Sequence, residues 1–306
     1  MRETEKMHKQ LNMFMEENAE SDMTDEQMND LLQRFMDQYN SAPRRQVTAA
    51  NAESADDYVE LAERTDSEKK ALEYARKALE LDPDNLDAER IAASAGAKDP
   101  MQTLENLRQA VIHGTAVMKS EGFMTKEYIG DFWGMVETRP YMRLRMEYVQ
   151  TLIEIGMYRK AAEECEDMIR LCTNDNLGMR YTLMYLYAYL EDERAALSLH
   201  KKYSGEEETQ MLLPLSVLYF KLYQLDKARD YLNRLAKANK DTKKFFRAVR
   251  QDNIEKYMDE MGSYGYRPFT IEELIISTVE NKFLFSSVPI YLWWADKQLV
   301  TKRKNV

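Results

Sequence analysis

Apolar residues recur at helical spacing along most of the chain. In residues 24–40 they fall three and four positions apart, as they do on one face of an α-helix: Met28, Leu31, Leu32, Phe35, Met36 and Tyr39. A similar pattern predicts a helix over residues 3–20, so that residues 1–40 form an amphipathic pair of helices. Methionine is frequent in both, and a Met-rich face can either pack in a core or adapt to different partners.

Capping signals mark the starts of two predicted helices. Thr24 and Gln27 match a capping box, in which the threonine hydroxyl accepts a free backbone N–H and the glutamine side chain accepts the backbone N–H of the threonine. Thr65 and Glu68 have the same spacing, so we expect Thr65 to cap a helix over residues 67–82.

Proline positions mark further helix boundaries. Pro83 ends a predicted helix, because proline disfavours helical geometry in the residue before it. Pro100 and Pro140 stand where a first helical residue is expected. Further helices are predicted over residues 85–95, 100–119, 125–136, 177–190, 240–250, 270–283 and 287–300.

A two-helix pattern recurs three times between residues 141 and 239. In each copy a small residue opens the second helix, at Ala161, Ala196 and Ala228, which are spaced 35 and then 32 apart. Alanine lets two helix backbones approach, whereas a large side chain there would cost roughly 1–3 kcal/mol by overpacking. An upstream copy carries its small residues at Ala71 and Ala78.

This pattern resembles the tetratricopeptide repeat, a helix–turn–helix unit of about 34 residues. The segment FWGMVETRPYMR at residues 132–143, followed by Asn-Asp-Asn at 174–176, is similar to a group of bacterial tetratricopeptide-repeat proteins with no assigned function. The resemblance extends from about residue 60 to the C-terminus. It implies an all-α fold of helical hairpins stacked in a right-handed solenoid, and it implies no catalytic residues. A generic helical bundle is the alternative.

These patterns divide the chain into four parts. We expect an N-terminal helix pair at 1–40, a linker at 41–57 with few large apolar residues, a repeat domain at 58–250, and capping helices with a tail at 251–306. Because a solenoid needs an element that closes its exposed end, Trp293 and Trp294 are predicted to cover the core there, with a dimer contact as the alternative. Whether the N-terminal pair docks or moves freely stays open.

Composition and charge narrow the possible partners. The chain is 44% hydrophobic and 31% charged, and its net charge is −10. Residues 1–100 hold 13 Lys and Arg against 24 Asp and Glu, which argues against nucleic acid because phosphates require a cationic surface. No apolar run is long enough to span a membrane, and the first residues lack the apolar core of a signal peptide. We therefore expect a soluble, cytoplasmic protein.

Motifs for enzyme chemistry are absent from the sequence. The three histidines, His8, His113 and His200, have no metal-ligand spacing. Cys165 and Cys172 are seven residues apart on one predicted helix, so their Cα atoms lie about 10 Å apart at the helical rise, too far for a disulfide. We expect no catalytic residues, no cofactor and no metal.

Two residue groups are candidates for partner binding. Arg139, Tyr141 and Arg143 could grip a partner's carboxylate, because arginine offers a planar fork of donors. The alternative is internal pairing of Arg143 with Glu147, and of Arg139 with Glu137 or a helix end.

The second candidate group lies in the predicted helix at 177–190. Arg180, Tyr181 and Tyr185 could face a peptide in the concave groove that first helices line in tetratricopeptide-repeat proteins, although packing on both sides of the helix explains them equally well. The sequence thus favours a non-catalytic adaptor that binds a protein or peptide. The alternatives are a peptide-sensing regulatory protein and an enzyme of unrecognised type. The partner's identity and the oligomeric state are not predicted.

Overall fold

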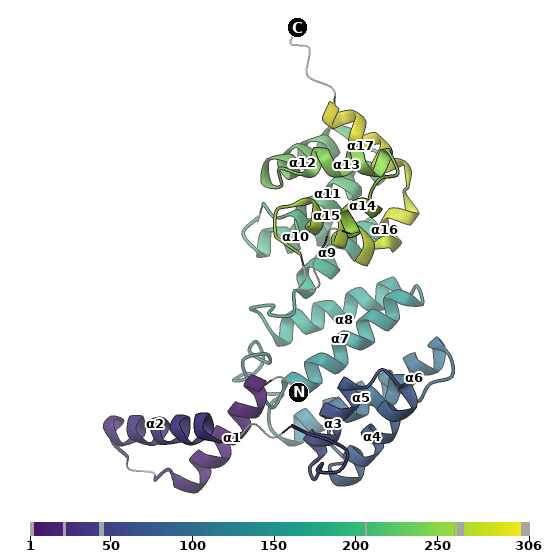
Figure 1. The fold of residues 1–306 in the computed structure, drawn as a ribbon. Helices are drawn as coiled ribbons and strands as arrows, with labels where there is room; N and C mark the ends of the chain where they lie inside the picture. The colour runs from purple at the N-terminus through teal and green to yellow at the C-terminus, as the bar shows by residue number, and fades with distance from the viewer. Residues whose placement is uncertain are drawn as a thin grey trace. The chain divides into compact units, whose positions relative to one another are not determined.

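The computed structural model describes residues 3–20, 23–42, 46–205, 207–259, 261 and 266–300. These residues form 17 α-helices and no strand, which confirms the prediction of an all-α protein (Figure 1). None of the helices in these ranges has the length and apolar character needed to cross a membrane.

The chain divides into two compact units, which are described separately. Unit 1 holds residues 1–156 and 170–174, and unit 2 holds residues 157–169 and 175–306. The helices of unit 1 are α1 (Glu3–Asn18), α2 (Asp25–Ser41), α3 (Ala55–Arg64), α4 (Glu68–Leu81), α5 (Leu86–Ala95), α6 (Pro100–Ser120) and α7 (Arg139–Glu154).

Helix α8 (Tyr158–Leu171) lies mostly in unit 2. The other helices of that unit are α9 (Met179–Leu190), α10 (Glu193–Lys202), α11 (Thr209–Lys221), α12 (Leu225–Ala238), α13 (Thr242–Arg250), α14 (Glu255–Asp259), α15 (Ile271–Glu280), α16 (Lys282–Ser287) and α17 (Ile290–Val300).

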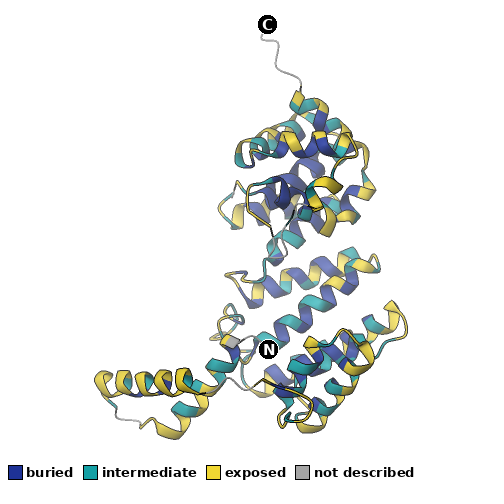
Figure 2. Ribbon diagram, in the orientation of Figure 1, coloured by how far each residue is buried: buried dark blue, intermediate teal, exposed yellow. Residues whose placement is uncertain are grey.

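In unit 1, helices that follow one another in sequence from α3 to α7 pack side by side. Small residues make this close packing possible. Ala75, Ala78 and Ala88 are fully buried in one apolar cluster with Val59, and Ala71 is buried at its edge. The predicted contact positions Ala71 and Ala78 are therefore in the core. Figure 2 shows α2 as mostly exposed, in contrast to these helices.

In unit 2, helix α11 is surrounded by other helices. It packs against α9, α10, α12 and α15, and every residue from Thr209 to Tyr219 is buried. The predicted small contacts Ala161, Ala196 and Ala228 are fully buried as well. Figure 2 shows the buried residues of this unit gathered in its interior.

The C-terminal helices lie against the other helices of unit 2. Helix α16 packs on α9, and α15 packs on α11 and α13. Trp294 is part of this packing, with its ring 5.0 Å from that of Phe220 and 5.8 Å from that of Tyr291. The prediction that Trp293 covers the core is wrong, because this side chain is 47% exposed and faces the ammonium of Lys297.

Most local signals in the sequence set the helix ends as predicted. Thr24 and Gln27 form the complete capping box of α2. The predicted cap Thr65 is wrong, since Ser67 caps α4 by accepting the backbone N–H of Lys70, while the Thr65 hydroxyl accepts the N–H of Ser67. Ser67 directly precedes Glu68, the first residue of α4, whereas Thr65 lies two residues further back.

The helix predicted at residues 125–136 is absent. These residues form successive turns, with Gly130 in a left-handed conformation at φ 118° that a helix cannot hold. The turns are tied to residues 170–174, because the backbone N–H of Gly130 donates to the carbonyl of Leu171 and that of Thr173 donates back to Gly130.

The expected linker at 41–57 is partly structured. Ser54 caps α3, which begins at Ala55, and Val47 is buried. Residues 43–45 of the linker and the tail at 301–306 lie outside the described residues. Cys165 and Cys172 are both buried and free.

Candidate functional site

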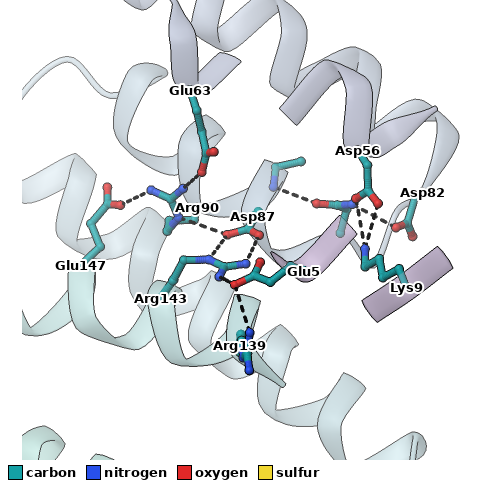
Figure 3. Close-up of polar contacts among 12 residues, drawn as sticks. Glu5, Lys9, Asp56, Glu63, Asp82, Asp87, Arg90, Arg139, Arg143 and Glu147 are labelled. Carbon is teal, nitrogen blue, oxygen red and sulfur yellow. Dashed lines mark hydrogen bonds and ion pairs between the residues drawn. The ribbon is translucent and has the colours of Figure 1, made fainter. Parts of the chain in front are cut away.

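The start of α7 presents two arginines one turn apart, Arg139 and Arg143 (Figure 3). The turns before the helix fix this start. The hydroxyl of Thr138, the residue before α7, donates to the carbonyls of Phe132 and Met135 and does not cap the helix. Residues 131–138 therefore fold onto themselves, and the spacing of four residues places both arginines on one side of α7.

Arg143 binds two carboxylates from distant parts of unit 1. Its Nε donates to Asp87 Oδ1 at 2.9 Å and its Nη2 to Oδ2 at 2.5 Å, while its Nη1 donates to Glu5 Oε1 at 2.8 Å. Asp87 comes from the first turn of α5, and Glu5 comes from α1. Both carboxylate side chains are only 3% exposed. All three nitrogens of the guanidinium thus donate to buried carboxylates.

Burial and ion pairing shift the pKa values of Asp87 and Arg143 in opposite directions. Burial alone would raise the pKa of Asp87, but the hydrogen bonds and charge of Arg143 and the charge of Arg90 outweigh it and leave the pKa below its ordinary value. Burial lowers the pKa of Arg143, whereas the hydrogen bonds and charges of Asp87 and Glu5 raise it above its ordinary range. Asp87 and Arg143 therefore stay ionised over the physiological pH range.

A second arginine, Arg90, holds the neighbouring carboxylates. Its Nη1 donates to Glu147 at 2.8 Å and its Nη2 to Glu63 at 2.9 Å, and its Nε lies 3.6 Å from Asp87 (Figure 3). The prediction that Glu147 pairs with Arg143 is wrong, because Glu147 is bound by Arg90 and by the hydroxyl of Ser94.

Arg139 is held differently from its neighbour. Its Nε donates to the carbonyl of Trp133 at 2.9 Å, its guanidinium lies over the Trp133 ring at 5.6 Å, and its Nη1 is 3.8 Å from Glu5. The predicted pairing with Glu137 is absent, since that carboxylate accepts from Asn12 of α1 at 3.0 Å. Glu5 thus lies near both arginines, bound by Arg143 at 2.8 Å and 3.8 Å from Arg139.

Helix α1 rests on this surface through several more polar contacts. Lys6 pairs with Glu60 of α3, and Lys9 Nζ lies 2.9 and 3.2 Å from the two carboxylate oxygens of Asp56. We call the residues that hold α1 the docking face: Asp56, Glu60, Glu137, Arg139 and Arg143. Helix α1 of the N-terminal pair is therefore docked on the rest of unit 1, a question that the sequence left open.

Tyr141 is not part of this surface. It is fully buried, and its hydroxyl shares a hydrogen bond of 2.8 Å with Thr115 of α6. The ring lies against Gly114, where an added Cβ would approach Tyr141 Cδ2 to 2.9 Å. Of the first predicted group, Arg139 and Arg143 are brought together at the docking face, and Tyr141 packs in the core.

The second predicted group, Arg180, Tyr181 and Tyr185, also divides into residues with polar contacts and a residue of the core. Arg180 pairs with Asp175 at 3.0 Å and stacks on the ring of Tyr181 at 4.2 Å, and the Tyr181 hydroxyl donates to Glu208. Tyr185 is fully buried, with its ring 6.3 Å from that of Phe285 in α16. A partner cannot contact Tyr185 while the C-terminal helices cover α9.

A surface hollow of about 410 Å³ lies beside α10 in unit 2. Its apolar floor includes Leu183 and Leu199, and Glu166 accepts a hydrogen bond from Tyr187 at its edge. Arg194 and Lys202 supply cationic groups along α10. This mixed lining suits a short peptide better than an ion, because it combines apolar area with both signs of charge.

Sequence reasoning missed the residues that complete the docking face. Asp87 reads as an ordinary acidic residue in a first helical turn, and Glu5 reads as part of a solvated face. The one relevant signal in the sequence is the surplus of acidic residues in the first hundred positions, which provides carboxylates for basic side chains elsewhere in the chain. That signal does not indicate which residues pair.

Neither a metal-binding group nor a comparison with known proteins indicates a role for the docking face. Among the residues that the structure describes, no three histidine, cysteine, aspartate or glutamate side chains are grouped so that they could hold a metal ion. A comparison with protein families finds no family model that matches the chain, and no curated protein matches it either.

Proposed function

We propose that this protein is a non-catalytic adaptor that binds a helix or peptide of a partner protein. In this proposal the helical hairpins stack as tetratricopeptide repeats do, in a right-handed solenoid. The burial of Ala71, Ala161, Ala196 and Ala228 supports the stacking, because small residues at these positions let paired helices approach closely.

The observation that carries the proposal is the way unit 1 holds α1. The docking face binds a helix that is remote in the sequence, through an arginine pair and three carboxylates. Side chains that bind one helix in this way can bind another of matching charge. A surface with these properties is what an adaptor requires.

The location of the binding surface differs from the one expected from the repeats. The face of α9 that includes Tyr185 is filled by α16, so a partner would have to displace the chain's own helix to bind there. Two other surfaces are candidates for a partner: the docking face of unit 1, from which a partner would have to displace α1, and the hollow beside α10 in unit 2.

Affinity capture with the full-length chain tests the adaptor function. The wild type would be compared with Arg139→Gln at the docking face, with an Arg194→Ala, Lys202→Ala variant at the hollow, and with Arg108→Gln as a control in an exposed ion pair. We expect a partner that the wild type and the control retain and that one surface variant loses. Binding must then be reproduced with the purified partner. If no protein is retained in stoichiometric amount, the adaptor proposal fails.

A further inference from the structure

Four polar side chains hold α1 on the rest of unit 1. On one face of the helix, Glu5, Lys6, Lys9 and Asn12 follow at spacings of one, four and seven from the first. These four side chains bind Arg143, Glu60, Asp56 and Glu137 respectively. The opposite side of α1 meets α2, where the rings of Phe14 and Phe35 are 5.5 Å apart. The face toward unit 1 is thus an electrostatic interface.

Apart from the buried pair of Glu5 and Arg143, the contacts of this interface are weak. Glu5 is the single buried residue of α1 among those whose burial is described. Lys9 and Asp56 are 41% and 31% exposed, and exposed ion pairs contribute only about 0–1 kcal/mol each. They also weaken as salt increases. Because another helix with the same charges can restore the Glu5–Arg143 pair and the outer contacts, α1 can be exchanged for it at small cost.

We infer that the docking face is a helix-binding site that α1 fills in cis, and that its ligand is a partner-protein helix with a carboxylate followed by lysines one and four residues later. This inference rests on the proposed adaptor function and specifies the partner's chemistry.

The charges of the docking face support this choice of ligand. Arg143 binds Asp87, and Glu5 is the carboxylate that both Arg143 and Arg139 approach, so a site without Glu5 accepts one further negative charge. Around them, Asp56, Glu60 and Glu137 form an anionic border. A free anion would be repelled by that border, and an acidic helix without lysines would be repelled along most of its length. A helix with Glu-Lys-x-x-Lys spacing places its carboxylate at the two arginines and its lysines at the anionic border.

The test uses α1 itself as the probe in trans. A fluorescent peptide of residues 3–18, held helical by a covalent link between the exposed positions 10 and 17, would be titrated with the full-length chain. The wild type would be compared with a Glu5→Gln, Lys6→Ala, Lys9→Ala variant, whose own α1 is released. A tethered segment competes at roughly millimolar effective concentration, so we expect the variant to bind the peptide at least about tenfold more tightly.

A charge exchange tests the register of the helix. The chain variant Asp56→Lys should bind a Lys9→Glu peptide more tightly than the native peptide, because the Lys9–Asp56 pair is then restored with reversed signs. Both chain measurements are made in the background in which the native α1 is released. Circular dichroism and a thermal melt check that each variant is folded, and a Lys6→Ala, Lys9→Ala variant that keeps Glu5 serves if the triple variant is not.

Three results would overturn the inference. The released variant could fail to bind the peptide, it could bind a Glu5→Gln peptide equally well, or the wild type could form dimers by exchanging α1, which would make a second copy the ligand. A peptide that binds while no partner is captured from cells would instead count against the adaptor function and leave the site intact.

Discussion

Replacing Arg143 with methionine should destabilise unit 1 strongly. Methionine keeps much of the side-chain volume and helix propensity but removes the fork that binds Asp87 and Glu5. Both carboxylates are then buried without their main cation. The loss of one partner from a buried ion pair costs about 3–5 kcal/mol, because the remaining charge is left uncompensated.

The neighbouring arginines limit this loss. Arg90 Nε stays 3.6 Å from Asp87, and Arg139 Nη1 stays 3.8 Å from Glu5, so each carboxylate retains one weaker cationic neighbour. We therefore expect a decrease of about 3 kcal/mol in the free energy of unfolding, at the lower end of the range for a broken buried pair. Adding Asp87→Leu to the Arg143 variant should recover part of the loss, since one buried charge is removed.

Urea unfolding followed by tryptophan fluorescence measures this effect. The chain has three tryptophans, and replacing Trp293 and Trp294 by phenylalanine leaves Trp133 as the reporter of unit 1. Arg108→Met is the matched control, because Arg108 pairs with Glu105 on the exposed side of α6. The reasoning is refuted if the Arg143 variant is no less stable than this control, or if the added Asp87→Leu change lowers stability further.

Three other predictions use the same unfolding assay. Gly114→Ala should cost about 1–2 kcal/mol, because the new Cβ would lie 2.9 Å from the Tyr141 ring and overpacking exceeds the gain in helix propensity. His113 has a raised pKa, chiefly through its hydrogen bond to Glu89, so its pairing stabilises the fold below about pH 6.5 and is lost as pH rises through the raised pKa. His113→Gln should therefore be less stable than wild type at pH 5.5 and equally stable at alkaline pH. Asp175→Ala should cost about 1–2 kcal/mol in unit 2, reported by the native C-terminal tryptophans, because its carboxylate accepts two backbone N–H groups at the start of α9.

Local features of the fold were predictable from the sequence because their causes are local. The capping box at Thr24, the proline at the start of α7 and the small contact residue Ala161 each depend on a few neighbouring positions. The false helix at 125–136 shows the limit of periodicity, since Gly130 at φ 118° ends any helix there although the apolar spacing continues.

Long-range features were not predictable in this way. Glu5 and Arg143 are 138 residues apart, and neither residue's neighbours indicate the other. Tyr185 belongs to a helix that is apolar on most faces, and that pattern is the same whether a partner or α16 covers it. Periodicity identifies a surface that must be covered, but only the fold decides which segment covers it.

The covering of α11 by C-terminal helices imposes an order on the synthesis of unit 2. Ser216 in α11 receives a hydrogen bond from Tyr291, 75 residues later, and Thr209 donates to Glu273, 64 residues later. At translation rates of about 5–20 residues per second, roughly 4–15 s pass between the synthesis of α11 and that of the helices that cover its apolar face. The helices of unit 1 from α3 to α7 pack on their immediate successors and need no such delay. Nascent chains should therefore require chaperone protection mainly while unit 2 is emerging from the ribosome.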